Sequence, residues 1–107
     1  MNQRITNLGY ELQPVAVACQ KVTISSTAGT LEGLGSFTFD ASTKVVLVTV
    51  ESNPARVDPS GTAPTTLVGQ PVVAGQQVML SIAEAKAAKW IRSTGGDATA
   101  QVSQYTY

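Results

Sequence analysis

The sequence predicts an all-β chain, folded as a single antiparallel β-sandwich or jelly roll with one short helix near residues 82–88. Short apolar stretches rich in Val and Thr recur along the chain and are bounded by Gly, Pro, Ser and Asn, which is typical of strands separated by turns. They follow one another closely, with no long βαβ pattern between them. A length of 107 residues suits one domain. We place that domain at residues 13–107, with a possible N-terminal arm at 1–12.

The first predicted strand spans residues 14–24, PVAVACQKVTI, and residues 25–30 form a loop after it. Cys19 lies within this apolar stretch. A free cysteine usually behaves as a small hydrophobic residue, so we expect a buried, inert thiol. A single cysteine also excludes a disulfide within the chain.

Two further strands are predicted before the middle of the chain. Residues 34–41, LGSFTFDA, alternate so that Phe37 and Phe39 share the inward face. Residues 44–52, KVVLVTVES, carry apolar side chains on both faces, which favours a central strand covered on both sides.

The last third of the chain combines the helix with two strands. Residues 81–84 read Ser-Ile-Ala-Glu, the capping-box pattern that starts a helix. Residues 89–93 suit a strand, the glycines of 94–97 (TGGD) indicate a hairpin turn, and residues 98–107 form the closing strand.

Composition bounds the class of protein. Seven basic and seven acidic residues give a net charge of zero, so the chain lacks the basic footprint of a nucleic-acid binder. It also lacks a basic amphipathic face for a membrane surface. The opening residues contain no apolar segment of a signal peptide, so we expect synthesis in a cytoplasm without export.

Catalytic chemistry has little support in the sequence. No histidine is present, which removes the commonest general base and metal ligand. The seven carboxylates are scattered, mostly at expected turns and strand ends. The glycine-rich residues 29–36 lack the Lys-Ser/Thr ending of a phosphate loop. We therefore expect a non-enzymatic protein without a cofactor or metal.

Two aromatic features leave alternatives open. Trp90 is either a core residue beside the short helix or a stacking platform for a sugar, and we favour the core. The terminal Tyr105-Thr106-Tyr107 is either a sticky sheet edge or an ordinary half-buried strand.

Residues 57–65, VDPSGTAPT, form the most distinctive loop of the sequence. Pro59 suits the first corner of a turn and Gly61 can take a positive φ, while Thr62 and Thr65 can bond to nearby backbone. The segment is at least a joint between strands. It is also placed where such folds present contact surfaces, and loop chemistry alone does not separate the two roles.

The residues just before this loop carry two further expectations. Arg56 can pair with Glu51 or Asp58, the alternative being a solvated side chain. Asn53 precedes Pro54, so extended geometry is expected for it.

Residues 45–107 contain, in order, an extended segment, a glycine- and proline-containing loop, a second glycine-bounded stretch and a closing hairpin. Their order is similar to the pattern V-E-x-x-P-x-R, D-G-T-x-P-T, G-x-x-L-x-x-G and I-R-x-x-x-x-D-A-x-x-x-V-x-Y. In that pattern the residues resemble a module of small structural proteins in tailed-bacteriophage virions. The matched positions are Val50, Glu51, Pro54, Arg56, Gly61, Thr62, Pro64, Thr65, Gly69, Gly75, Ile91, Arg92, Asp97, Ala98, Val102 and Tyr105. The chain departs from the pattern at Ser60, where the family has Asp before the glycine.

The resemblance implies a bacteriophage virion protein, foremost a capsid decoration or cement protein that binds the major capsid protein at the head surface. The alternative is a tail, neck or fibre-associated module that binds a carbohydrate or receptor. Self-association as a trimer or dimer is also expected, because few charges protect the sheet edges. Candidate contact residues come from the arm and the 56–65 loop: Arg4, Tyr10, Arg56, Asp58, Ser60, Thr62 and Thr65.

Overall fold

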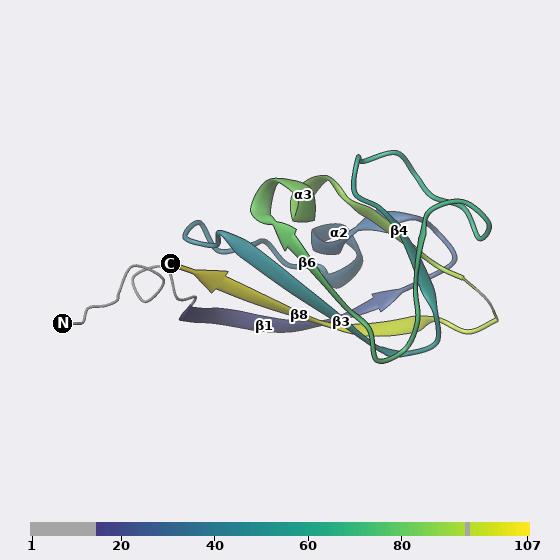
Figure 1. Ribbon diagram of the computed structural model, residues 1–107, viewed down its shortest axis with the longest axis horizontal. Coiled ribbons are helices and arrows are strands. Elements are labelled where there is room, and N and C mark those ends of the chain that lie inside the picture. Colours follow the sequence, from purple (N-terminus) through teal and green to yellow (C-terminus); the bar gives the residue numbers. More distant parts are fainter. Residues whose placement is uncertain (1–14, 94) are drawn as a thin grey trace.

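Two four-stranded antiparallel sheets pack against each other in the computed structural model, which describes residues 15–93 and 95–107 (Figure 1). The predicted all-β sandwich is therefore confirmed. The predicted arm at residues 1–12 lies outside the described residues.

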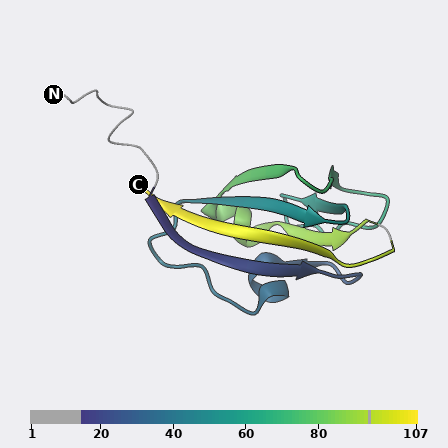
Figure 2. The same ribbon diagram turned by 90° about the horizontal axis from the view of Figure 1, so that it is seen from below.

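Each sheet is built from strands that are far apart in the sequence. The first sheet has the order β1 (Val15–Ile24), β8 (Ala98–Thr106), β3 (Val45–Ser52) and β6 (Gln77–Ser81). The second has the order β2 (Gly29–Thr30), β7 (Lys89–Arg92), β4 (Ala55–Asp58) and β5 (Gln70–Val72). Figure 2 shows the first sheet, with the start of β1 and the end of β8 at the same end. The pairing is nested, because β1 pairs with β8, β2 with β7, β3 with β6 and β4 with β5.

The core lies between the two sheets and follows the period-2 pattern of the strands. In β3, Val46 and Val48 are fully buried, and Trp90 of β7 is fully buried in the opposing layer. The core assignment of Trp90 is thus confirmed. β3 is central, as predicted, but the prediction that both its faces are covered is wrong. Leu47 on the outer face is only half-buried, because no layer of the described chain lies over that face.

Within residues 15–93 and 95–107, two short helices accompany the sheets, where the sequence predicted one for the chain. The predicted helix is α3 (Ile82–Ala87), and its capping box is formed: the Ser81 hydroxyl accepts from the Glu84 amide, and the Glu84 carboxylate accepts from the Ser81 amide, both at 3.2 Å. The additional helix is α2 (Leu31–Gly35). It begins where the Thr30 hydroxyl accepts from the amide of Gly33, and it ends at Ser36 in the left-handed conformation.

The strand predicted at residues 34–41 is wrong. α2 occupies its start, and the remainder belongs to no strand. The Glu32 carboxylate accepts from the Phe39 amide at 2.9 Å, so a side chain replaces a neighbouring strand as the backbone partner. Phe39 is still buried and Phe37 half-buried, with their rings edge-to-face at 5.1 Å. The alternation therefore predicted the inward side chains but not the backbone conformation.

The corner between β3 and β4 and the corner between β7 and β8 both differ from the sequence predictions, because each joins strands of different sheets. Asn53 has φ +60° rather than extended backbone, and its side-chain amide donates to the Asp97 carbonyl at 3.0 Å. The glycines near residues 94–97 do not close a hairpin, because β7 and β8 belong to different sheets. Each corner carries the chain from one sheet to the other.

Cys19 is exposed, so the expectation of a buried thiol is wrong. It is paired with Ser103 on the outer face of the first sheet, and its thiol lies 3.6 Å from the Ser103 hydroxyl. A register shift between Ala16 and Ala18 precedes it. Val22 and Ile24 are the buried residues of β1, so its even-numbered side chains point inward. Cys19 has an odd number and therefore lies on the outward face.

Candidate functional site

The connection between β4 and β5 is a loop built from its own polar groups. At its start the Asp58 carboxylate accepts from the hydroxyl of Ser60 at 2.6 Å and from the amide of Ser60 at 2.9 Å. These two bonds, the hydroxyl bond first, hold the pKa of Asp58 below its ordinary value of 3.8. The Gly61 amide closes the turn on the Asp58 carbonyl, with Gly61 at φ +95°. The predicted turn roles of Pro59 and Gly61 are thus confirmed.

The far end of the loop is a second closed turn centred on Thr65. Its hydroxyl accepts from the amides of Leu67 and Val68 at 3.2 and 3.0 Å, and its own amide donates to the Val68 carbonyl at 2.9 Å. The prediction that Thr65 bonds to nearby backbone is confirmed. We call residues 65–68 the loop tip.

Arg56 holds the loop tip against β4. Its Nε donates to the carbonyl of Thr66 at 3.0 Å, and its Nη1 donates to the carbonyl of Gly69 at 2.9 Å. Neither proposed role is therefore correct: Arg56 is not paired with Glu51 or Asp58, and it is not simply solvated. A guanidinium carries several donors in a fixed planar arrangement, and this lets one side chain bind two carbonyls of one loop.

Packing against neighbours restricts the loop further. Pro64 is buried, and a Cβ at Gly69, where φ is +129°, would come within 3.0 Å of the Pro64 ring. Gly61 lies over the end of α3, where a Cβ would meet the Ala87 carbonyl at 3.3 Å. These close approaches fix the loop between α3 and β4.

The loop tip therefore presents two exposed apolar side chains on a hydrogen-bonded turn. Leu67 is 83% exposed and Val68 63% exposed, although the backbone amides of both are hydrogen bonded to the Thr65 hydroxyl. No charged side chain occurs in residues 59–70. Such a tip can enter a shallow apolar depression on another protein at little entropic cost, because its shape is already set. In Figure 1 the loop follows β4 and extends away from the sheets.

The sequence-predicted contact residues fall into three groups. Arg4 and Tyr10 lie outside the described residues. Arg56, Asp58, Ser60 and Thr65 form the hydrogen bonds that hold the loop together, and Ser60 and Thr65 are also exposed. Thr62 is exposed on the surface of the loop.

Sequence reasoning missed Leu67 and Val68, the residues that the loop presents. Their signal was an apolar pair too short for a strand, between the turn-forming Thr65 and Gly69.

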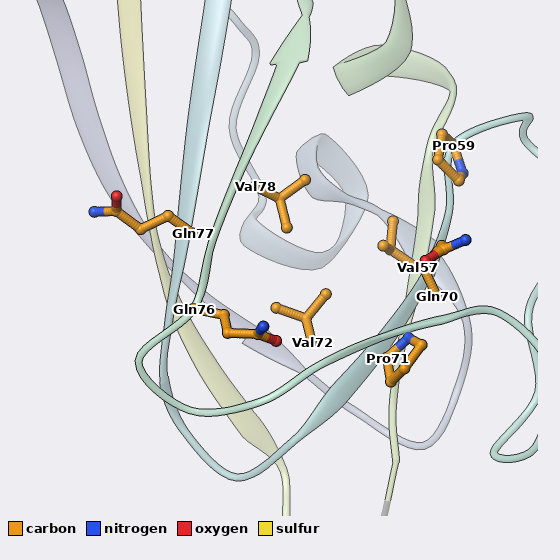
Figure 3. A pocket seen from close by; sticks show the side chains of 8 residues that line it. All are labelled: Val57, Pro59, Gln70, Pro71, Val72, Gln76, Gln77 and Val78. Carbon is orange, nitrogen blue, oxygen red and sulfur yellow. The ribbon is translucent and has the colours of Figure 1, made fainter.

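A cavity of about 200 Å³ lies next to the base of this loop, between β5 and β6. In Figure 3 the side chains of Val57, Val72 and Val78 point toward one another across it, whereas Gln77 points away. The remaining lining residues are Pro59, Gln70, Pro71 and Gln76. No acidic, basic or nucleophilic side chain lines the cavity, so it is suited to holding an apolar group.

Within residues 15–93 and 95–107, no three Cys, Asp or Glu side chains come together as a metal-binding group would require. The same residues include no helix with the length and apolar character needed to cross a membrane. Comparison with known proteins finds no matching family model, no matching curated protein and no matching solved structure.

Proposed function

We propose that this chain is a non-enzymatic virion protein of a tailed bacteriophage, which binds the major capsid protein and stabilises the head shell. The observation that carries the proposal is the rigid, uncharged β4–β5 loop with Leu67 and Val68 at its tip. The resemblance of residues 45–107 to small virion proteins supports the same assignment. The proposed location is the outer surface of the head.

The strand pairing adds a second line of support. Nested pairing of the first strand with the last, the second with the seventh, and so on inward is the arrangement of a jelly roll. We therefore extend the proposal to a jelly-roll fold, an architecture found in viral capsid and lectin domains. The fold alone does not define the function, which rests on the loop.

The proposed mechanism is binding of the assembled state. A protein that binds the closed shell and not its dissociated subunits stabilises the shell by mass action. Burying the Leu67 side chain at the contact would contribute about 1.5–3 kcal/mol per site. Repetition over many sites of one shell multiplies this energy.

The test compares particles that carry the chain with particles that lack it. We expect the particles that lack it to release DNA at a lower temperature, and added purified protein to rebind and restore the release temperature. The double variant Leu67→Ser/Val68→Ser should bind at least about tenfold more weakly, a loss of 1.4 kcal/mol or more. The change should leave the fold intact, since both side chains are exposed.

Val73→Ser is the matched control, because Val73 is also exposed, at 51%, but belongs to the β5–β6 connection. It should bind like the unaltered chain. If particles without the chain keep their DNA to the same temperature and the purified protein does not rebind, the proposal fails. A tail, neck or fibre location would then be the better account. For a module that binds carbohydrate, Trp90 is not available as a surface on which a sugar could stack, because it is fully buried.

A further inference from the structure

The four edge strands of the sandwich differ in how they are protected. β2 has only two residues, and β5 has three, including Pro71, which lacks an N–H group. β1 carries Lys21 and a register shift near its start. Each of these features discourages a foreign strand from pairing. β6, with the sequence QVMLS, has no charge, no proline and no register shift.

β6 also presents unused backbone groups. Gln76 and Ile82 flank β6. The Gln76 carbonyl accepts from the Val50 amide of β3 at 3.1 Å, and the Ile82 amide donates to the carbonyl of Lys44, the residue before β3, at 3.0 Å. In an antiparallel pair every second residue bonds to the same neighbour, so the even-numbered residues of β6 face β3. The backbone N–H and C=O groups of Gln77 and Met79 therefore face away from β3. Among the described residues, no strand pairs with this side of β6.

Each face of β6 offers an apolar side chain beside this edge, although the outer face also carries Gln77 and Ser81. Val78 points into the cavity between β5 and β6, and Met79, on the outer face, is 69% exposed. A strand added here would gain main-chain hydrogen bonds from the edge and an apolar cavity for its inward side chains. That is the mode of recognition called β-augmentation.

The N-terminal segment of the chain has the matching pattern. In residues 8–12, LGYEL, the apolar residues Leu8, Tyr10 and Leu12 occupy every second position, so a strand of this segment has one apolar face. We propose that residues 8–12 of one copy add as a further strand to β6 of a second copy, with that face over the cavity. This interface between copies does not depend on binding to a shell.

The length of the segment determines which copy can supply it. Val15 begins β1, at the opposite edge of the sheet from β6, so a strand beyond β6 lies four strand spacings away, about 19 Å. Leu12 precedes Val15 by three residues, which span at most about 11 Å. The chain's own Leu12 therefore cannot reach that position, whereas a neighbouring copy can supply it. Exchange of this kind closes a dimer or a ring such as a trimer.

Disulfide crosslinking between full-length chains tests the proposal. One chain carries Glu11→Cys or Gly9→Cys and a size tag, and the other carries Met79→Cys, all with Cys19→Ser. Gly9 and Glu11 alternate with the apolar face and would lie on the same side as Met79. On mild oxidation we expect a crosslinked pair of tagged and untagged chains from at least one of the two mixtures, because neighbouring strands bring Cβ atoms within disulfide reach.

The natural Cys19 supplies the matched control. It lies in the same row of the outer face as Met79, through Ser103 and Leu47, but at the β1 edge. The tagged chain with Glu11→Cys or Gly9→Cys is mixed with an untagged chain that keeps both Cys19 and Met79. This mixture should give no crosslink. A chain carrying both new cysteines serves as the second control. Crosslinks only within that chain, crosslinks to Cys19 as efficient as those to Met79→Cys, or no crosslink to Met79→Cys would each overturn the proposal.

Sedimentation equilibrium provides a second measurement without new cysteines. Met79→Lys places a charge at the proposed edge, the device that natural edge strands use against pairing. We expect the dissociation constant between copies to rise at least about tenfold, while Val73→Ser leaves it unchanged. An unchanged constant for Met79→Lys, or a monomeric unaltered chain at high concentration, would contradict the proposal.

Discussion

The core between the sheets and the β4–β5 loop hold their shapes in different ways. The core is a set of apolar side chains from both sheets and both short helices, held together by packing alone. The loop depends on specific hydrogen bonds that Arg56 donates and that the side chains of Asp58 and Thr65 accept. A change in the core should therefore cost global stability. A change in the loop should alter local order and contact geometry.

The largest expected effect is in the core, at Trp90. Trp90→Ala should lower the free energy of unfolding by about 3–5 kcal/mol, because it leaves a cavity between the sheets. Urea denaturation measures the change. Trp90→Phe should cost less, since it retains most of the packing and removes an indole N–H that has no hydrogen-bond partner. A loss within about 0.5 kcal/mol for the alanine variant would mean that the core does not depend on this residue.

The next effect concerns Gln104, which with Thr43 is one of two buried polar residues among the described residues. Its side-chain oxygen accepts from the Asp40 amide at 2.8 Å and the Thr43 hydroxyl at 2.7 Å, and its side-chain nitrogen donates to Gln20 at 2.8 Å. Gln104→Ala should cost about 1–3 kcal/mol, because the buried Thr43 hydroxyl and the Asp40 amide lose their acceptor. Gln101→Ala, on the outer face of the same strand, should stay within about 0.5 kcal/mol. Equal losses in chemical denaturation would remove the distinction between the two faces.

Arg56→Ala should have a smaller global effect and a clear local one. Its two bonds are partly exposed, so we expect a loss of roughly 1 kcal/mol. The amides of Leu67 and Val68 should exchange hydrogen markedly faster, because the loop tip loses its attachment to β4. Arg92→Ala is the control: it removes an exposed ion pair to Asp97, at 2.8 Å, and should leave exchange at the tip unchanged. Unaltered exchange in Arg56→Ala would show that the tip is ordered without it.

The smallest expected effect is the pH response of Asp58. Hydrogen bonds from Ser60 lower the pKa of Asp58 in the folded chain, so its stabilising contribution is present above the ordinary value of 3.8. That contribution is lost as the pH falls from there through the lowered pKa. Ser60→Ala should raise the pKa of Asp58 toward 3.8.

The pKa of Asp40 serves as the internal control, because Asp40 has the same lowering arrangement with Ser42 and should not respond to Ser60→Ala. Carbon NMR of the carboxyl groups measures both pKa values in one titration. If Asp58 titrates at 3.8 in the unaltered chain, its turn does not stabilise the charged form.

Features set by neighbouring residues were predictable from the sequence. Period-2 alternation predicted that the side chains of Phe37 and Phe39 point inward, because alternation needs only the local pattern to define an inward face. The capping box predicted the start of α3, and the residues of the turn after Asp58 predicted its geometry. In each case the groups that bond lie within four positions of one another.

Contacts between distant residues required the tertiary structure. Whether residues 34–41 form a strand depended on a partner strand that does not exist there. The exposure of Cys19 depended on the register of β1 against β8, where one position reverses every side chain. The sequence alone determined an all-β chain, the burial of Trp90 and Phe39, the start of α3 and the turn after Asp58. Only the assembled sheets decided which edge stays open at β6 and that Arg56 binds the carbonyls of the loop, because both depend on what the fold brings alongside.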